Sequence, residues 1–382
     1  MKRIVSKDAL NKVALCICFL SVLPIARGAE PITIAMTAAH WQTKENAEFL
    51  RHLGFFNGLM RLNSGDAALN DVTFSDGTIE FDVNTIGRGA PGIAFRQKDK
   101  DNFELLYLRP DPNCPAFHSC IQYAPQTHGV LLWDFFPQYE SRAPLRENGW
   151  NHIKMVVSGR RMNVFVNDAP SPTLQVGRLE GDALSGGLRL AGPGTFANLV
   201  ITPDAVNGLS SEPVRDPVEG DSRLVRNWRL SAYSTLPSGK DPMYNEEPDA
   251  SQEWKPISTE RNGLVNLSRE YGLPVHEPDR AVAWLKTTIT SDRKQTKKVD
   301  IGWTREVWVF VNGKLVYADK NIWDLEASRK APDGLCSLEN GAFTLSLEAG
   351  DNEVAVALAN NFYGWGLMLR LDDLEGVHLA AR

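Results

Sequence analysis

Apolar and polar residues alternate in short runs along most of this chain, which is the period-two pattern of strands buried on one face. In residues 78–83, isoleucine, phenylalanine and valine alternate with Glu80 and Asp82. Residues 343–347 and 354–358 show the same alternation in the second half of the chain. We therefore predict an all-β fold made of antiparallel β-sandwiches of the jelly-roll type.

The tetrapeptide Val-Phe-Val-Asn occurs twice, at residues 164–167 and 309–312. The first copy runs into Asp168 and the second into Gly313. A β-branched and aromatic run that ends in Asn-Asp or Asn-Gly predicts a hairpin, because these residues tolerate the positive φ of tight turns. The surrounding residues do not correspond, so we interpret the copies as core strands of two different domains and not as an internal repeat.

One segment without alternation separates the two halves. Residues 204–221 are rich in proline, acidic and small polar residues, a composition typical of a linker. This predicts a first sandwich over residues 30–203 and a second over residues 222–382. Within the first, residues 46–53 are the one segment whose pattern favours a helix.

Residues 1–29 have the order of a secretory signal peptide: four basic residues, an apolar run, and then small residues before the cleavage site. The alternative is an uncleaved membrane anchor, but the apolar run is shorter than the roughly 20 residues that span a bilayer. No later segment is long and apolar enough to cross a membrane. We therefore expect a secreted or periplasmic protein.

The net charge argues against nucleic acid as a partner. The whole chain carries −6 at pH 7, and the leader contributes +4 from five basic residues and one acid, which leaves −10 for the mature chain. Nucleic acids and anionic membranes both require a basic surface. An acidic exported protein is a poor candidate for either.

Three cysteines remain after the leader is removed: Cys114, Cys120 and Cys336. An oxidising compartment favours a disulfide, and Cys114 and Cys120 would close a short local loop. Pairing of either one with Cys336 would instead connect the two halves. A zinc site made of Cys114, His118, Cys120 and His128 is a further alternative, although these residues lack the usual paired spacing.

Several strands of the first half carry a family resemblance. The segments concerned are residues 74–83, 92–96, 101–103, 107–109, 149–154, 164–167 and 196–201. Together they resemble the concanavalin A-like lectin/glucanase superfamily, with the layout of laminin-G-like and 3-keto-disaccharide hydrolase-like domains, over roughly residues 55–203. The resemblance implies a jelly roll and leaves the activity open.

The same resemblance identifies a possible active site. Retaining glucanases of this class place Glu, Asp and Glu at alternate positions of one strand, so that the outer two face the substrate together. Here the strand reads Glu80, Asp82 and Asn84, and an amide cannot act as the acid or base. Glu80 and Asp82 are more simply the polar face of a half-buried strand. A catalytic site made of Glu80, Asp82 and His152 is the alternative.

One turn of the first half could bind a metal. Asp99, Asp101 and Asn102 offer the oxygen atoms that calcium prefers. The alternative is a polar hairpin tip, which needs no metal. Beyond a possible calcium ion, the sequence indicates no cofactor.

The second half resembles the galactose-binding-like jelly roll, an accessory module of many glycosidases, through residues 306–314 and 347–356. It also holds seven of the ten tryptophans. Sugars stack their C–H faces on aromatic rings, and loops at one end of a sandwich can converge on a ligand. The candidate ligand-binding residues, taken from such loops, are Trp303, Trp323, Asn361, Tyr363 and Trp365. The alternative is that they seal the core or contact the first domain.

These patterns favour a carbohydrate-binding protein without a catalytic site of its own, with a glycan as its partner. Two other classes stay open. One is a glycoside hydrolase, glucanase-like or 3-keto-glycoside hydrolase-like. The other is a structural or adhesive cell-surface protein whose exposed aromatic residues contact another protein.

Overall fold

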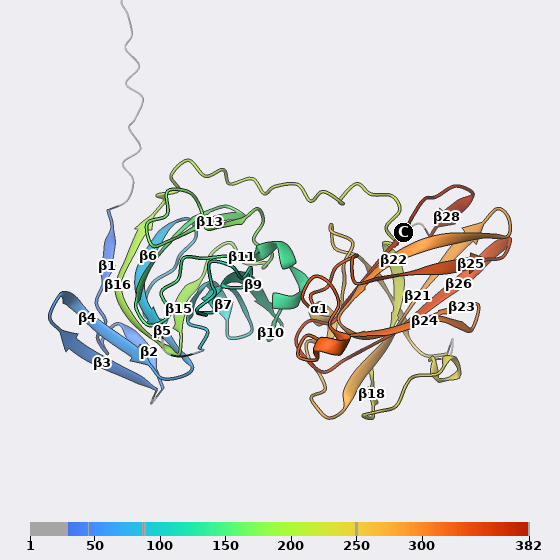
Figure 1. Cartoon of the computed structure of the whole chain (residues 1–382), viewed down its shortest axis with the longest axis horizontal. Helices are drawn as coiled ribbons and strands as arrows, with labels where there is room; N and C mark the ends of the chain where they lie inside the picture. The colour runs from blue at the N-terminus through green and yellow to red at the C-terminus, as the bar shows by residue number, and fades with distance from the viewer. Residues whose placement is uncertain (1–29, 45, 86, 88, 249–250, 381–382) are drawn as a thin grey trace, which may run out of the picture.

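The computed structural model describes residues 30–44, 46–85, 87, 89–248 and 251–380. The signal peptide predicted over residues 1–29 lies outside these ranges. The described chain is all-β and folds as antiparallel sheets that pair into two sandwiches (Figure 1). The prediction of an all-β antiparallel fold is confirmed. Among the described residues, no helix has the length and apolar character needed to cross a membrane.

The first sandwich consists of two sheets, which we call sheet 1 and sheet 2. Sheet 1 has eight strands in the order β14 (Leu174–Val176), β13 (Arg161–Val166), β12 (Trp150–Ser158), β6 (Gly77–Thr85), β16 (Gly194–Pro203), β4 (Phe55–Leu62) and β3 (Ala47–His52), with β1 (Ile32–Ile34) paired to β16. Sheet 2 has the order β10 (Val130–Leu131), β9 (Ile121–Thr127), β8 (Asn102–Leu108), β7 (Gly92–Asp99), β15 (Gly187–Ala191), β5 (Asp66–Leu69) and β2 (Trp41–Thr43), with β11 (Glu140–Ser141) paired to β9.

The alternation seen in the sequence places each strand's apolar face in the core. On β6, the side chains of Ile79, Phe81 and Val83 are buried between the sheets, and Glu80 and Asp82 lie on the outer face. Burial of these three apolar side chains removes apolar surface from water, and this effect is the main force that holds the two sheets together. The expectation of a helix over residues 46–53 was wrong, because this segment pairs with β4 as strand β3.

The second sandwich is built in the same way from sheets 3 and 4. Sheet 3 has the order β19 (Trp254–Ser258), β17 (Asn227–Ser231), β21 (Arg280–Ser291), β26 (Gly350–Asn360), β23 (Arg305–Val311) and β24 (Lys314–Asn321), with β18 (Ser234–Leu236) and β28 (Val377–Leu379) paired to β21. Sheet 4 has the order β20 (Val265–Asn266), β27 (Gly366–Leu371), β22 (Gln295–Trp303) and β25 (Gly341–Leu347). The helical turns are α1 (Ser268–Tyr271), η1 (Trp133–Phe135), η2 (Pro137–Tyr139), η3 (Tyr244–Glu246) and η4 (Glu326–Ser328).

The two Val-Phe-Val-Asn segments end differently. Asn312 and Gly313 both have positive φ and form a two-residue hairpin in which Val311 pairs with Lys314. Asn167 and Asp168 also both have positive φ, and the Ala169 N–H donates to the Val166 carbonyl at 3.3 Å, but the next strand begins only at Leu174, so β13 and β14 pair across a longer loop. The Asn167 side chain instead accepts a hydrogen bond from the His152 N–H at 3.0 Å. This bond fixes the start of β12, where His152 lies.

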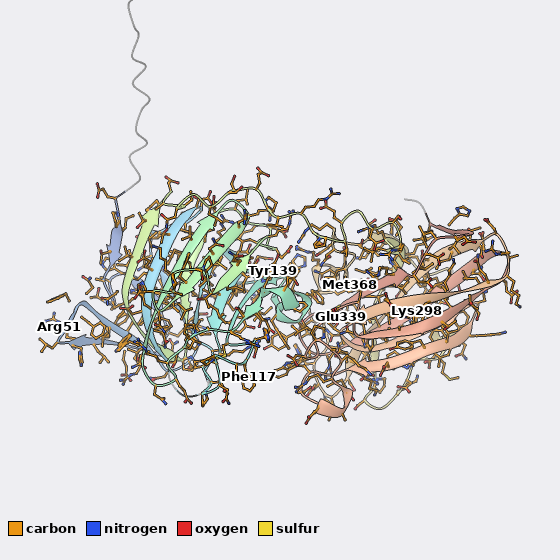
Figure 2. All side chains as sticks on the ribbon, turned by 45° about the horizontal axis from the view of Figure 1, so that its top comes forward. Arg51, Phe117, Tyr139, Lys298, Glu339 and Met368 are labelled. Carbon is orange, nitrogen blue, oxygen red and sulfur yellow. A yellow bond between two sulfur atoms is a disulfide. The ribbon has the colours of Figure 1, made fainter. Side chains whose placement is uncertain are left out.

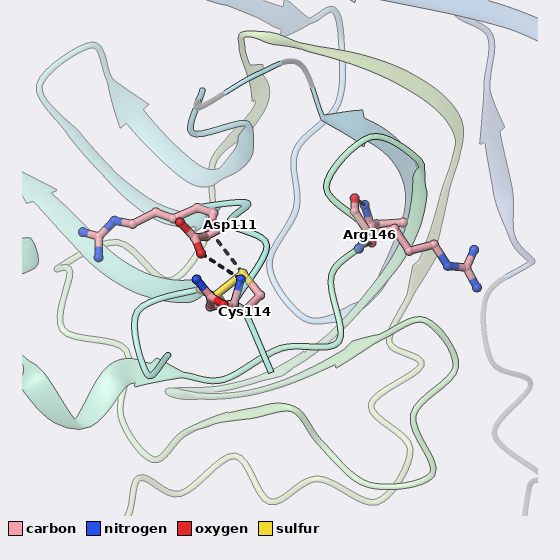
Figure 3. The surroundings of a disulfide bond; sticks show 7 residues. Asp111, Cys114 and Arg146 are labelled. Carbon is pink, nitrogen blue, oxygen red and sulfur yellow. Dashed lines mark hydrogen bonds between the residues drawn. A yellow bond between two sulfur atoms is a disulfide. The ribbon is translucent and has the colours of Figure 1, made fainter. Parts of the chain in front are cut away.

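The loop after β8 contains a disulfide between Cys114 and Cys120, whose Cα atoms lie 5.4 Å apart (Figure 3). The predicted local bridge is therefore confirmed, and it rules out both the pairings with Cys336 and the zinc alternative. Cys336 is a buried free thiol, and burial raises its pKa. In the turn between β7 and β8, the Asp99 carboxylate accepts hydrogen bonds at 2.8 Å from the Asp101 N–H and from the Asn102 side chain. The Asp99 carboxylate is thus hydrogen-bonded within its own turn, which is the arrangement of a polar hairpin tip.

The segment predicted as a linker, residues 204–221, contains no strand and runs from the first sandwich to the second (Figure 1). Its first part packs on the first sandwich. The Arg160 N–H donates to the Ser211 carbonyl at 3.1 Å, and the Val214 N–H donates to the Gly177 carbonyl at 2.9 Å. This part of the segment therefore covers one end of sheet 1.

Candidate functional site

The five candidate ligand residues of the second sandwich do not gather into one open site, because of these five only Trp323 and Tyr363 are exposed, at 41% and 37%. Trp303 and Trp365 are both fully buried, and the indole N–H of Trp365 donates to the Leu358 carbonyl at 3.2 Å. A ring buried on both faces has no surface on which a sugar could stack. For these two residues the structure corrects the prediction and assigns them to the core of the second sandwich.

Two of the other three candidates, Trp323 and Tyr363, lie where the second sandwich meets the first. Trp323 and Tyr363 contact the ring of Trp133 edge-on, with centroid distances of 5.3 and 5.7 Å. Asn361 is buried, accepting a hydrogen bond from Arg305 at 3.1 Å and donating one to the Asp279 carbonyl at 3.0 Å. The loops thus contact the first sandwich, as the alternative interpretation anticipated.

Asp134, in η1 of the first sandwich, is central to this contact. Both oxygens of its buried carboxylate lie 3.2 Å from the Gly364 N–H, which donates to them. A side chain on Gly364 would meet Asp134 Oδ1 at 2.4 Å, and one on Gly366 would meet the Phe135 ring at 2.9 Å. The Gly-Trp-Gly sequence therefore allows close packing of η1. Burial raises the pKa of Asp134 to about 7.

Two ion pairs also join the first sandwich to the second. Arg261 of the second sandwich pairs with the buried Glu180, and Arg269 pairs with Asp182 at 2.9 Å. Both acids belong to the first sandwich. In Figure 1, sheet 2 faces the second sandwich and sheet 1 lies on the far side. The second sandwich therefore leaves the broad outer face of sheet 1 uncovered.

This open face brings together the three residues of the catalytic alternative. His152 lies opposite Asp82 in the pairing of β12 with β6. His152 Nδ1 lies 2.8 Å from Asp82 Oδ1, and His152 Nε2 lies 3.6 Å from Glu80 Oε2. The exposed fractions of these side chains are 32% for His152, 23% for Asp82 and 35% for Glu80, so all three can reach a ligand.

A β-bulge adds Asn198, which the sequence analysis did not identify. The register of β16 against β6 shifts between Ala197 and Val200, and Asn198 within the bulge has a φ of 51°. Bulges redirect side chains, and here the Asn198 amide donates to Asp82 Oδ2 at 2.7 Å. The positive-φ asparagine is the one local signal that could have suggested a bulge.

The hydrogen bond between the two central groups shifts their pKa values in opposite directions. Burial opposes the charge of Asp82, but the hydrogen bonds from His152 and Asn198 outweigh it and lower the pKa of that carboxyl. The hydrogen bond to Asp82 raises the pKa of His152. The imidazole Nδ1–H therefore donates to an ionised carboxylate. Lys154 adds a second charge pair with Glu80 at 3.3 Å.

Two hollows lie on this face. We call the first the sheet-1 pocket: a hollow of about 600 Å³ lined by His152 and Lys154 of β12, by Arg161, Asn163 and Phe165 of β13, and by the loops around residues 168 and 206–210. A second hollow of about 520 Å³ includes Asn84 and Thr195. Trp150, opposite Asn84, packs against Phe55 with a centroid distance of 4.7 Å. Polar and aromatic groups thus follow one another across the sheet.

No protein-family model matches the chain, and no curated protein matches it either. Solved structures similar to it include the carbohydrate-binding module CBM66 from Bacillus subtilis, with 20% identity over 46% of this chain and 98% of the module, at a TM-score of 0.30. A Bacillus licheniformis β-glucanase matches with 11% identity over 47% of this chain and 99% of the glucanase, at a TM-score of 0.31. A toad ovary galectin in complex with thio-digalactose matches with 11% identity over 36% and 96%, at a TM-score of 0.25. At these TM-scores the likenesses carry no argument about function.

Proposed function

We propose that this protein is a secreted or periplasmic carbohydrate-binding protein whose ligand contacts the outer face of sheet 1. One observation carries the proposal: His152, Asp82 and Asn198, from three different strands, form a hydrogen-bonded cluster on an open face. The cluster adjoins a pocket that could hold a small ligand. Export rests on the leader predicted from the sequence.

The chemistry of this face suits a sugar. Each sugar hydroxyl both donates and accepts hydrogen bonds, and the ring presents apolar C–H groups that stack on aromatic side chains. Glu80 and Asp82 supply acceptors, and Lys154 and Asn198 supply donors. Phe165 adds a half-buried ring in the adjoining pocket. Because the polar groups are already bonded to one another, their geometry is set before a ligand arrives.

Binding fits this cluster better than hydrolysis does. The third position of the strand is Asn84, on the same face as Glu80 and Asp82, and an amide cannot replace a catalytic carboxylate. The two-carboxylate mechanism of retaining glucanases therefore lacks one partner.

The test is a broad glycan array followed by calorimetric titration with the mature chain. We expect His152→Ala and Asn198→Ala each to weaken binding of the best glycan by about tenfold, the equivalent of one hydrogen bond of about 1.4 kcal/mol. Lys298→Ala removes an exposed side chain on the second sandwich and serves as the control (Figure 2). Tyr363→Ala probes the loops of the second sandwich.

The outcomes separate the three function classes. Unchanged affinity in both sheet-1 variants, with a loss in Tyr363→Ala, would move the site to the second sandwich. Release of reducing sugar that Glu80→Gln abolishes would favour the hydrolase. Failure of the array to identify any bound glycan would refute carbohydrate binding and favour the structural or adhesive protein.

A further inference from the structure

The sheet-1 pocket contains a cation without a counter-charge. Arg161 lies at the start of β13, half-buried, with its side chain on the outer face of sheet 1. Within the part of the chain that the structure describes, its guanidinium makes no hydrogen bond and no ion pair, and its Nε atom is shielded from solvent. A buried N–H without an acceptor is unfavourable, at about 1–3 kcal/mol.

Other arginines of the chain show how unusual this is. Five more have a buried side-chain nitrogen without an acceptor, and each of them also forms an ion pair with a carboxylate. These are Arg96 with Asp76, Arg189 with Asp66, Arg261 with Glu180, Arg280 with Glu306 and Arg370 with Asp300. Among the described residues, Arg161 is the one of these six arginines without such a partner.

The neighbours of Arg161 on its strand complete a recognition surface. Arg161, Asn163 and Phe165 alternate along β13 and all line the pocket. With a rise of about 3.3 Å per residue, the three positions span about 13 Å of one strand face. A guanidinium, an amide and an aromatic ring are thus presented in line on a rigid element.

The charge of the pocket differs from that of the chain. The whole chain carries −6, yet three of the residues that line this pocket are basic and one is acidic. Lys154 and His152 already pair with Glu80 and Asp82. Asp168 follows the opposite end of β13 from Arg161, and its charge helps to raise the pKa of His152. This leaves Arg161 as the group available to an incoming anion.

We propose that the sheet-1 pocket binds the anionic group of an acidic glycan, a uronate carboxylate or a sulfate ester, through the guanidinium of Arg161. Asn163 and Phe165 then contact the ring of the same sugar. Arginine suits this role because its planar N–H groups bind carboxylate and sulfate oxygens in pairs. The inference deepens the proposed function and rests on it.

The experiment compares three ligands of equal length with the mature chain: a neutral galactan oligomer, an oligogalacturonate and a sulfated galactan oligomer. We expect at least one acidic oligomer to bind about tenfold more tightly than the neutral one, with the better of the two identifying the anion. Arg161→Gln should abolish this preference, and Arg161→Lys should restore part of it. Raising the salt concentration should weaken the acidic ligands more than the neutral one.

Arg51→Gln is the matched control, since it removes an exposed arginine at the tip of the β3–β4 hairpin, away from the pocket (Figure 2). Equal affinity for neutral and acidic oligomers, or an acidic affinity that Arg161→Gln leaves unchanged, would overturn the inference while the proposed function stands. Titration with sulfate alone detects the opposite case, in which the anion pocket exists but the proposed function is wrong. Sulfate binding that requires Arg161, without binding of any glycan, would support the anion pocket and refute the proposed function.

Discussion

Asp134 tests how the two sandwiches are joined. Its carboxylate is buried in the contact, both oxygens share the single Gly364 N–H, and Arg305 is the cation whose charge acts on it. Burial outweighs these favourable interactions and raises the pKa of Asp134 from 3.8 to about 7. The contact therefore stabilises the protonated acid.

The sign of the pH dependence follows from proton binding. Between pH 4 and pH 7 the unfolded chain has released this proton while the folded chain keeps it, so the free energy of unfolding falls as the pH rises. A pKa change from 3.8 to about 7 corresponds to about 4 kcal/mol. This contribution is fully present below pH 4 and is lost above pH 7.

The assay is urea unfolding of the wild type and of Asp134→Asn, monitored by tryptophan fluorescence, at half-unit steps from pH 4 to pH 8. Asparagine has the same shape and no charge, so the difference between the two proteins isolates Asp134 from every other titrating group. We expect the unfolding free energy of the wild type, relative to the variant, to fall by about 4 kcal/mol over this range. Asp182→Asn, which removes an exposed acid at the same contact, is the control.

The reasoning would be refuted if the difference in unfolding free energy between the wild type and Asp134→Asn stayed constant within about 0.5 kcal/mol from pH 4 to pH 8. A constant difference would mean that water reaches the carboxylate, and therefore that η1 is not packed against the Gly364 loop as described. A fall of similar size in Asp182→Asn would show that the effect is general and not due to the buried acid.

Two further predictions concern stability. Gly364→Ala adds a methyl group 2.4 Å from Asp134 Oδ1 and should lower the free energy of unfolding by about 1–3 kcal/mol, measured in urea; an unchanged midpoint would contradict the close packing. Replacing both Cys114 and Cys120 by serine should cost about 2 kcal/mol in thermal unfolding, because the open loop gains freedom in the unfolded state. Equal melting temperatures with and without a reducing agent in the wild type would argue against the bridge.

Much of the fold could be predicted from the sequence because the signals are local. A period of two assigns each residue of a strand to one face, so Ile79, Phe81 and Val83 could be placed in the core from their spacing alone. Cys114 and Cys120 are close enough in sequence to pair. The helix expected at residues 46–53 failed because pairing with β4 outweighed a local preference.

The aromatic loops show where local signals end. An aromatic residue beside a glycine, such as Tyr363, suits a ligand site and a domain contact equally well. The decision came from Trp133 and Asp134, more than 200 residues away, which pack against these loops. No pattern within the loops could reveal that partner.

What the sequence by itself determined is the class of structure and the face of each strand, since both follow from the spacing of neighbouring residues. The site was decided by the tertiary structure. Asp82 and Asn198 are 116 positions apart, and only the register of β6, β12 and β16 with its bulge places them beside His152. Likewise, the unpaired state of Arg161 depends on which acids the fold brings near it, and that is a property of the whole sheet.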